Sequence, residues 1–272
     1  MNNGPRPGFT PPAPGGGPAL APLLEVTDVS KSFGGIAAVN HMSFTVQPGE
    51  SVGLVGPNGA GKTTLFNCIC GQLRPETGRV ELAGTEIGGL AVYQRARLGI
   101  GRTYQRVEVF PDMTVREHLL VAERARRGDG RLWKDMCNRS RPAADELRRV
   151  AEVLDLVGIG DRADDSASAL GLGLCRLVEL ARALVAQPSI LLADEPSSGL
   201  DVHETKELAK VLRTLQHERG MAVLLVEHDL AMVGAVVDRA IVMDLGSMVA
   251  QGTFAEVMAD PLVRDAYLGT SA

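Results

Sequence analysis

A glycine-rich loop carries the residues whose spacing points most clearly to chemistry: Gly56-Pro57-Asn58-Gly59-Ala60-Gly61-Lys62-Thr63. The apolar run 52–55 precedes the loop and Thr64 begins a helix-like segment, so the order is strand, loop, helix. The glycines let backbone N–H groups approach an anion, and the helix N-terminus adds a positive dipole end. Lys62 would reach the β- and γ-phosphates of a nucleotide, and the Thr63 hydroxyl would bind Mg²⁺. The pattern therefore predicts a phosphate site, and a glycine-rich turn that binds nothing is the alternative.

Two carboxylates stand at the end of a second apolar run. Asp194 and Glu195 directly follow residues 190–193, which have the character of a strand buried on both faces. Unpaired charges are costly to bury, so acids in this place need a reason. Beside a phosphate loop, Asp194 would bind Mg²⁺ through its water shell, and Glu195 would polarise the water that attacks the γ-phosphorus. An ordinary strand end with solvated acids is the alternative.

The composition of the 272 residues excludes several classes of protein. The net charge is −5, which argues against a nucleic-acid binder because basic residues neutralise phosphates. The four cysteines lack a framework spacing and the five histidines form no ligand pair, which favours reduced thiols without a structural zinc site. No apolar run reaches the ~18 to 20 residues that span a bilayer, and the N-terminus lacks the pattern of a signal peptide. We therefore expect any membrane role to depend on a partner.

Apolar periodicity predicts an α/β fold with a mostly parallel sheet to position these residues. Expected strands lie at 24–29, 39–46, 51–55, 79–82, 190–193 and 222–226, with a hairpin over 240–252. Expected helices lie at 63–71, 90–98, 115–126, 143–157, 203–220, 230–237 and 254–259. Residues 1–22 contain 12 Pro or Gly and are expected to form a disordered tail before a single domain over 23–272. The section from about 104 to 184 is helix-rich and is interpreted as an insertion into the α/β core.

Together these patterns resemble the ATP-binding subunit of an ABC transporter, and the likeness covers residues 23–272. The resemblance implies a P-loop NTPase core with a mostly parallel sheet, an antiparallel β subdomain and a helical insertion, which is the ABC ATPase fold. It also implies ATP and Mg²⁺ as ligands, with residues 56–64 binding the nucleotide and Glu195 acting in catalysis.

Further residues match the family in order. Phe33 stands where the family places an aromatic ring that stacks on adenine. Gln105 matches the glutamine that joins the metal shell and senses the membrane partner, and His228 matches the switch histidine that contacts the γ-phosphate. Ser198 and Asp201 match the loop that crosses the dimer interface. The implied metal ligands are Thr63, Gln105 and Asp194.

Two stretches indicate one branch of the family. Residues 102–122, RTYQRVEVFPDMTVREHLLVA, and 266–269, AYLG, resemble the ATP-binding subunit of branched-chain amino acid importers, a LivG-like branch that includes urea and other amide importers. Residues 127–141 resemble the longer insertion of that branch. The resemblance implies membrane permease subunits as partners, a solute-binding protein acting indirectly, and a location on the cytoplasmic face of the plasma membrane. It does not identify the solute, which never touches this subunit.

One motif departs from the family pattern. The signature L-S-G-G-Q should precede the helix that contains residues 179–182, where the sequence has Leu170-Gly171-Leu172-Gly173-Leu174-Cys175-Arg176. Gly171 replaces the serine and Leu174 replaces the glutamine. In the family this segment caps the γ-phosphate bound by the other subunit, and Gly171 still offers a backbone N–H at a helix N-terminus. A hydrogen bond to a charged group contributes roughly 1.5–3 kcal/mol. Without the serine hydroxyl, the closed-state affinity or the hydrolysis rate at the opposing site would therefore fall about ten- to a hundredfold.

The altered signature bears on the partner of this chain. A homodimer would have two weakened sites, whereas a heterodimer with an intact-signature subunit would keep this chain's own site complete. Importers of the resembled class use two different ATPase subunits, so a heterodimer is favoured. Two other functions stay open. The first is a soluble ABC ATPase of DNA repair or translation, but such proteins usually have coiled coils, tandem domains or basic patches, and the sequence has none. The second is a module that holds ATP without hydrolysing it, and Glu195 and His228 argue against that function.

Overall fold

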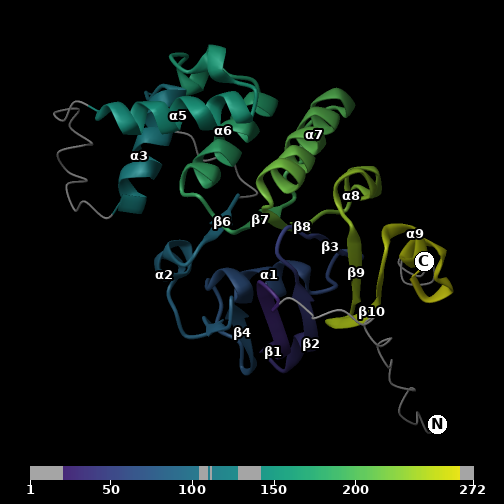
Figure 1. Cartoon of the computed structure of the whole chain (residues 1–272). Helices are drawn as coiled ribbons and strands as arrows, with labels where there is room; N and C mark the ends of the chain where they lie inside the picture. Colours follow the sequence, from purple (N-terminus) through teal and green to yellow (C-terminus); the bar gives the residue numbers. More distant parts are fainter. Residues whose placement is uncertain (1–20, 104–109, 111, 128–141, 264–272) are drawn as a thin grey trace, which may run out of the picture.

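A six-stranded sheet lies at the centre of the computed structural model, which describes residues 21–103, 110, 112–127 and 142–263 (Figure 1). The strand order is β10-β9-β3-β8-β7-β6, and every neighbouring pair is parallel except β10 and β9. This arrangement confirms the predicted α/β fold with a mostly parallel sheet. The strands are β3 (Ser51–Val55), β6 (Ile100–Arg102), β7 (Ile190–Asp194), β8 (Ala222–Val226), β9 (Arg239–Asp244) and β10 (Ser247–Gly252).

The central strands are apolar throughout because their side chains alternate between two cores. In β7, Leu191 and Ala193 belong to one hydrophobic core, whereas Ile190 and Leu192 belong to the other. Strands β3 and β8 divide their residues in the same way. A strand covered on both faces needs apolar residues at every position rather than at alternate ones. This requirement explains the continuous runs that identify these strands in the sequence.

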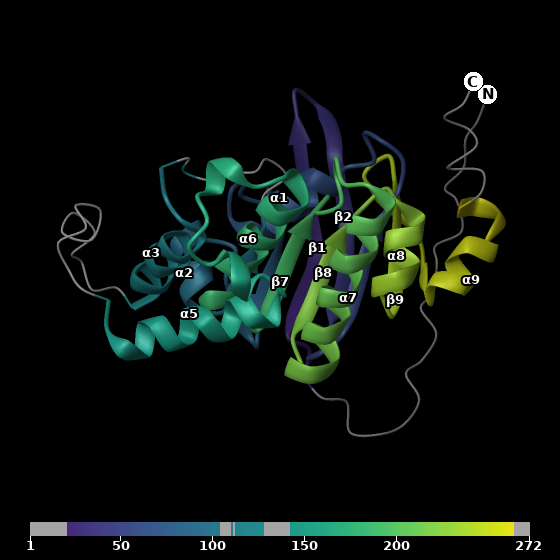
Figure 2. The same cartoon turned by 90° about the horizontal axis from the view of Figure 1, so that it is seen from above.

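Helices cover both faces of the sheet. Leu65 and Phe66 of α1 share a core with Val26 and Val39 of the second sheet, so α1 packs between the two sheets. The other core includes residues of α3, α5, α6, α7 and α8, and Figure 2 shows α7 and α8 lying along that face. The helices are α1 (Lys62–Cys70), α2 (Val92–Arg97), α3 (Val115–Arg127), α5 (Ala144–Leu156), α6 (Leu172–Val185), α7 (Val202–Arg219), α8 (Leu230–Val236) and α9 (Phe254–Ala259).

A second, antiparallel sheet has the order β2-β1-β4-β5. It consists of β1 (Leu24–Phe33), β2 (Ile36–Val46), β4 (Thr77–Leu82) and β5 (Thr85–Glu86). The observed β1 is longer than the predicted strand 24–29. Register shifts interrupt its pairing with β2 between Val26 and Ser32, and Asp28 has a φ of 55°. These bulges break the alternation of apolar residues on which the prediction depended.

Three helices, α3, α5 and α6, pack together beside the central sheet (Figure 1). Thr114 and Glu117 form a capping box before α3: the Thr114 N–H donates to Glu117 Oε2 at 2.8 Å, and the Glu117 N–H donates to Thr114 Oγ1 at 3.2 Å. Residues 1–20 of the expected tail, and parts of the expected insertion, lie outside the described residues, so the domain boundaries stay predictions. Within the described part of the chain, no helix combines the length and apolarity needed to cross a membrane.

Candidate functional site

The glycine loop joins β3 to α1 and requires glycine where its backbone meets other strands. Gly56, Gly59 and Gly61 have φ values of 147°, 82° and 97°. A Cβ atom on Gly56 would collide with the Met243 carbonyl oxygen, and one on Gly61 would collide with the Ala38 carbonyl oxygen. Gly59 has open space beside it, and only its φ restricts the residue type. The loop is therefore supported from β2 and β9 while its tip faces solvent.

Lys62 lies inside the loop and is 7% exposed. Its Nζ donates to the carbonyl oxygens of Gly56 at 2.7 Å and Pro57 at 2.9 Å. Burial lowers the pKa of Lys62, while Glu195 and Asp194 act electrostatically in the opposite direction. The two acidic residues come from the end of a strand about 130 residues further along the chain. Thr63 is exposed at the first turn of α1.

Asp194 and Glu195 lie at the carboxyl edge of the sheet. Asp194 ends β7, is 4% exposed and has its pKa raised by burial, an effect opposed mainly by Arg102. Glu195 has a φ of 45°, and its N–H donates to the Val226 carbonyl oxygen at 2.8 Å. A non-glycine residue in this region is held there by its surroundings, so the turn after β7 is fixed against the end of β8.

Arg102 has no role predicted from the sequence. Its Nη2 donates to Asn67 Oδ1 at 3.2 Å and lies 3.9 Å from Asp194 Oδ2, while the guanidinium stacks 5.0 Å from the centre of the Phe66 ring. It therefore connects α1, which follows the glycine loop, with the end of β7. Its position at the last residue of β6, on the same sheet edge, is the signal that could have identified it.

His228 follows β8 at the same edge and its side chain is 60% exposed. The residue before it, Glu227, is fully buried and was also missed by sequence reasoning. Glu227 Oε1 accepts hydrogen bonds from the Ser197 N–H at 2.9 Å and the Ser197 hydroxyl at 2.6 Å, and Oε2 accepts one from the His228 N–H at 3.2 Å. A carboxylate directly after a buried strand is the signal that already singled out Asp194.

Of the two residues predicted to contact adenine and the metal shell, the structure describes Phe33 but not Gln105. Phe33 ends β1 with 48% of its surface exposed, and the Lys31 ammonium lies 5.5 Å from the centre of its ring. It can therefore offer a ring face to a base. Gln105 lies outside the described residues.

The altered signature forms the start of α6. Gly171 is the N-cap, with an extended backbone and open space where a side chain would lie. A side chain on Gly173 would collide with Glu204, the capping-box residue of α7, and a Cβ atom on Gly199 would lie 2.8 Å from the Leu172 side chain. The signature therefore packs closely against the loop between β7 and α7.

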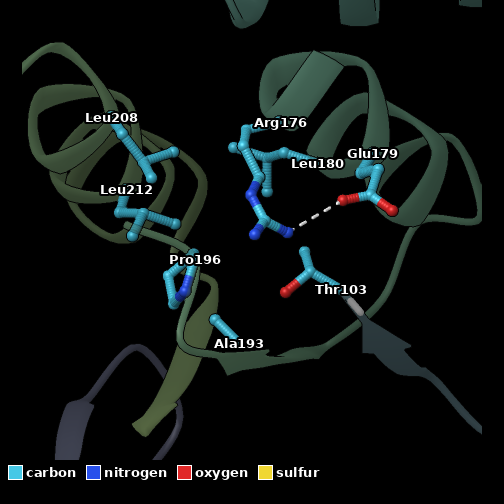
Figure 3. A pocket seen from close by; sticks show the side chains of 8 residues that line it. All are labelled: Thr103, Arg176, Glu179, Leu180, Ala193, Pro196, Leu208 and Leu212. Carbon is cyan, nitrogen blue, oxygen red and sulfur yellow. Dashed lines mark hydrogen bonds and ion pairs between the residues drawn. The ribbon is translucent and has the colours of Figure 1, made fainter. Parts of the chain in front are cut away.

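Asp201 and Ser198 belong to that loop. Asp201 caps α7, its carboxylate accepting the Glu204 N–H at 2.8 Å. Figure 3 shows Arg176 of α6 pointing towards Pro196, with a buried ion pair to Glu179 at 3.3 Å. Arg176 Nη2 also donates to the Ser198 carbonyl oxygen at 3.3 Å, which fixes the loop to the signature helix.

Leu174, in place of the family's glutamine, is partly buried and lines a cavity of about 180 Å³ between α6 and α7. Leu177, Leu200 and Leu208 line the same cavity. The lining also includes the polar side chains of Arg176, His203, Glu204 and Glu207, so apolar and charged groups meet beside Leu174.

The predicted residues fall into two groups. The glycine loop, Asp194, Glu195 and His228 follow β3, β7 and β8, which are neighbours in the sheet with Leu54 and Asp194 both paired to Val226. Ligands of open α/β sheets bind at such a carboxyl edge. The second group consists of Leu170, Gly171, Leu172, Gly173, Ser198 and Asp201, carried by α6 and the loop before α7.

Comparison with known proteins places the chain. The family model described as "ABC transporter" matches residues 39–198, and one described as "Branched-chain amino acid ATP-binding cassette transporter" matches residues 247–272. The high-affinity branched-chain amino acid transport ATP-binding protein LivG of Escherichia coli (strain K12) is 41% identical over 251 residues, which cover 91% of this chain and 98% of LivG. BraF of Pseudomonas aeruginosa, described in the same words, is 38% identical over the same coverage.

Among solved structures, the ADP conformation of MJ1267, an ATP-binding cassette of an ABC transporter, superposes with a TM-score of 0.82 and 28% identity, covering 92% of this chain and all of MJ1267. The family match spans more than half of the chain, and the relatives match along nearly their whole length. The fold is that of an ATP-binding cassette, and the chain belongs to the ABC transporter family.

Proposed function

We propose that this chain hydrolyses ATP to energise the import of branched-chain amino acids through a membrane permease. The observation that carries the proposal is the arrangement at the carboxyl edge of the sheet, where Leu54 before the glycine loop and Asp194 both pair with Val226. The choice of solute is supported by the family match at residues 247–272 and by the names of LivG and BraF.

The residues at this edge suit Mg²⁺ and a nucleotide. Mg²⁺ prefers hard oxygen ligands and is usually held by one or two carboxylates together with substrate phosphates. The exposed Thr63 hydroxyl and the buried Asp194 carboxylate are such ligands, and Gln105 is proposed as a third. When bound, the metal would neutralise charge on the β- and γ-phosphates. Among the described residues, no three His, Cys, Asp or Glu side chains gather into a metal cage.

The protein residues then have separate tasks. Lys62 exchanges its two carbonyl partners for phosphate oxygens, and the loop N–H groups surround the β-phosphate. Glu195 polarises the water that attacks the γ-phosphorus, the bond to the bridging β–γ oxygen breaks, and ADP and phosphate result. His228 contacts the γ-phosphate from the end of β8. Phe33 stacks on the adenine.

Half of the closed site is proposed to come from a second ATP-binding subunit. Leu170, Gly171, Leu172 and Gly173 would cap the nucleotide bound by that subunit, with Ser198 and Asp201 at the interface. Because Gly171 lacks the hydroxyl of the family signature, a heterodimer with an intact-signature subunit is favoured over a homodimer. The permease would hold both subunits at the cytoplasmic face of the plasma membrane, and a solute-binding protein would act indirectly.

The test is ATP turnover and solute uptake by the complex reconstituted with the permease, ATP-binding and binding-protein genes that neighbour this one. We expect leucine, isoleucine or valine, delivered by the binding protein, to stimulate hydrolysis, and Lys62→Ala to abolish both stimulation and uptake. If only urea or another amide stimulates ATP hydrolysis, that compound would replace the branched-chain amino acids as the proposed solute. Hydrolysis indifferent to the permease and every such solute would overturn the transport function itself.

A second function, a module that holds ATP without hydrolysing it, is favoured by the departures at Gly171 and Leu174. Measurable turnover by the purified chain, lost in a Glu195→Gln variant, would exclude it.

A further inference from the structure

We propose that Glu227 is a positioning residue for hydrolysis, a buried carboxylate that fixes His228 relative to the turn that carries Glu195. The inference rests on the proposed function, because it assigns a role within that ATP site. Glu227 would touch neither ATP nor the attacking water and would act through the two residues that do.

The first observation is the complete burial of a charged group. Glu227 has no exposed surface, and a buried carboxylate is unfavourable unless donors compensate it. Three donors converge on it: the Ser197 N–H and hydroxyl on Oε1, and the His228 N–H on Oε2. All three are donors, so a carboxylate satisfies them without conflict.

The second observation is that two of these donors belong to Ser197, in the turn after β7 that also carries Glu195. Ser197 lies two residues after Glu195, in a turn that also contains the Ser198 N–H to Glu195 carbonyl hydrogen bond of 3.1 Å. The Glu195 N–H is bound to Val226, the residue before Glu227. The turn after β7 is therefore attached to the end of β8 at two points, one through the backbone and one through the Glu227 side chain.

The third observation concerns His228. Its backbone is bound to Glu227, its Nδ1 lies 3.8 Å from Glu227 Oε2, and most of its side chain faces solvent at the carboxyl edge of the sheet. One carboxylate thus sets the backbone of the histidine and the turn of the acid. Since near-attack geometry tolerates little displacement, loosening either would slow the chemical step without removing a contact to the nucleotide.

Glu227→Gln is the sharpest variant because it keeps the shape and removes the charge. The single glutamine oxygen can accept the hydrogen bonds from Ser197, but the amide NH₂ then faces the His228 N–H. Both groups are donors, so no hydrogen bond can form between them. We expect kcat to fall about ten- to a hundredfold while the Kd for ATP changes less than threefold. Ser197→Ala, which removes one of the three donors, should give a smaller fall.

The matched control is Glu123→Gln in α3. Glu123 is equally buried and is paired with Arg126 and Arg149 away from the ATP site. It should lower Tm without changing kcat per folded molecule. A purely structural role for Glu227 would give the same outcome in its own variant, and that result would overturn the proposal.

Two further measurements separate this inference from the proposed function. In a His228→Ala background, Glu227→Gln should add less than a twofold loss, because the glutamine oxygen still serves Ser197 and the donor conflict falls on residue 228 alone. A full additional loss contradicts the proposal. Absence of turnover in the unaltered complex would refute the proposed function, and amide hydrogen exchange then decides the inference alone. Glu227→Ala must speed exchange at the amides of Ser197 and His228 while β3 stays protected, and unchanged exchange at both would overturn it.

Discussion

At the scale of single residues, the ATP site is held ready by contacts within the protein. Lys62 donates to carbonyl oxygens of the loop in which it lies, and Asp194 is buried beside Arg102. Both charged groups are therefore confined before any phosphate arrives, which reduces the ordering that binding must impose. Glu195 is confined differently, through its backbone at φ 45° and the hydrogen bond to Val226.

Glu195→Gln tests the role of the acid. The amide keeps the size of the side chain but is a poor proton acceptor, so we expect kcat to fall by about 10²- to 10⁴-fold. ATP binding should persist, and the variant should accumulate as an ATP-bound dimer in size-exclusion chromatography. Glu207→Gln changes a half-exposed acid of α7 that pairs with Lys210; it is the control and should hydrolyse ATP normally. Normal turnover by Glu195→Gln would remove the acid from the mechanism.

Gly171→Ser tests the altered signature. The space beside Gly171 is open, so the serine can be accommodated at the N-cap, where replacing glycine changes helix stability by only a few tenths of a kcal/mol, roughly. We expect turnover at the site that this signature caps to rise about ten- to a hundredfold, with Tm nearly unchanged. Gly89→Ser, in an equally open loop, should change neither. If ATP turnover is the same in Gly171→Ser, Gly89→Ser and the unaltered protein, the missing hydroxyl does not limit hydrolysis at the site that this signature caps.

Local sequence patterns point to the candidate catalytic residues more readily than to the residues that position them. Asp194 and Glu195 were singled out because they directly follow a buried run, and motif order singled out His228. Arg102 and Glu227 were missed because their partners, Asn67 and Ser197, are 35 and 30 positions away in the chain. Their places at strand ends are visible in the sequence, but the tertiary packing that brings α1 and the turn after β7 to these strand ends is not encoded by any local pattern.

At the scale of elements, helix α1 shows how one segment serves the site and the core together. Its first residues carry Lys62 and Thr63, while Phe66 and Ile69 fill the core between the two sheets. The predicted helix 63–71 agrees with α1 to within one residue at each end, because the glycine loop marks where the helix begins. Strand β1 was predicted poorly beyond residue 29, since bulges there replace the alternating pattern by irregular pairing.

Two buried thiols on α1 predict alkaline instability. Burial raises the pKa of Cys68 to about 11 and that of Cys70 to about 12, above the ordinary value of 9.0. The folded state therefore keeps protons that the unfolded state loses, so this contribution to stability is complete below pH 9 and declines as the pH rises from there. Between pH 9 and about 10.5, Cys70 alone should cost about 2 kcal/mol.

Denaturant unfolding of Cys70→Ala at several pH values checks this. The variant should be less stable than the unaltered protein at pH 8, because it leaves a cavity, and the difference should narrow by pH 10.5. Ile69→Val, a neighbouring core change without a titratable group, should show a difference that does not vary with pH. A constant difference for Cys70→Ala as well would mean that the thiol does not titrate as stated.

At the scale of the whole molecule, the two groups of site residues have different supports. The glycine loop and its acids stand at the carboxyl edge of the sheet, whereas the signature begins α6 and packs on the loop before α7. Leu172 and Val202 expose apolar surface at the start of their helices, beside the predicted interface residues Ser198 and Asp201. An exposed apolar surface of this kind suits contact with a second subunit.

The unequal signature makes the proposed heterodimer asymmetric, and that asymmetry can be measured. The glycine loop of this chain would face the partner's intact signature, whereas the partner's loop would face Gly171. In the purified complex, Lys62→Ala should therefore remove most of the ATP turnover, and the equivalent lysine change in the partner should remove little. Mixing altered and unaltered subunits and measuring phosphate release per complex tests both directions, with Lys210→Ala on the exposed face of α7 as the control. Equal losses from the two lysine changes would show that the sites are coupled or equivalent and would contradict the asymmetric assignment. A complex that forms only between copies of this chain would contradict the heterodimer itself.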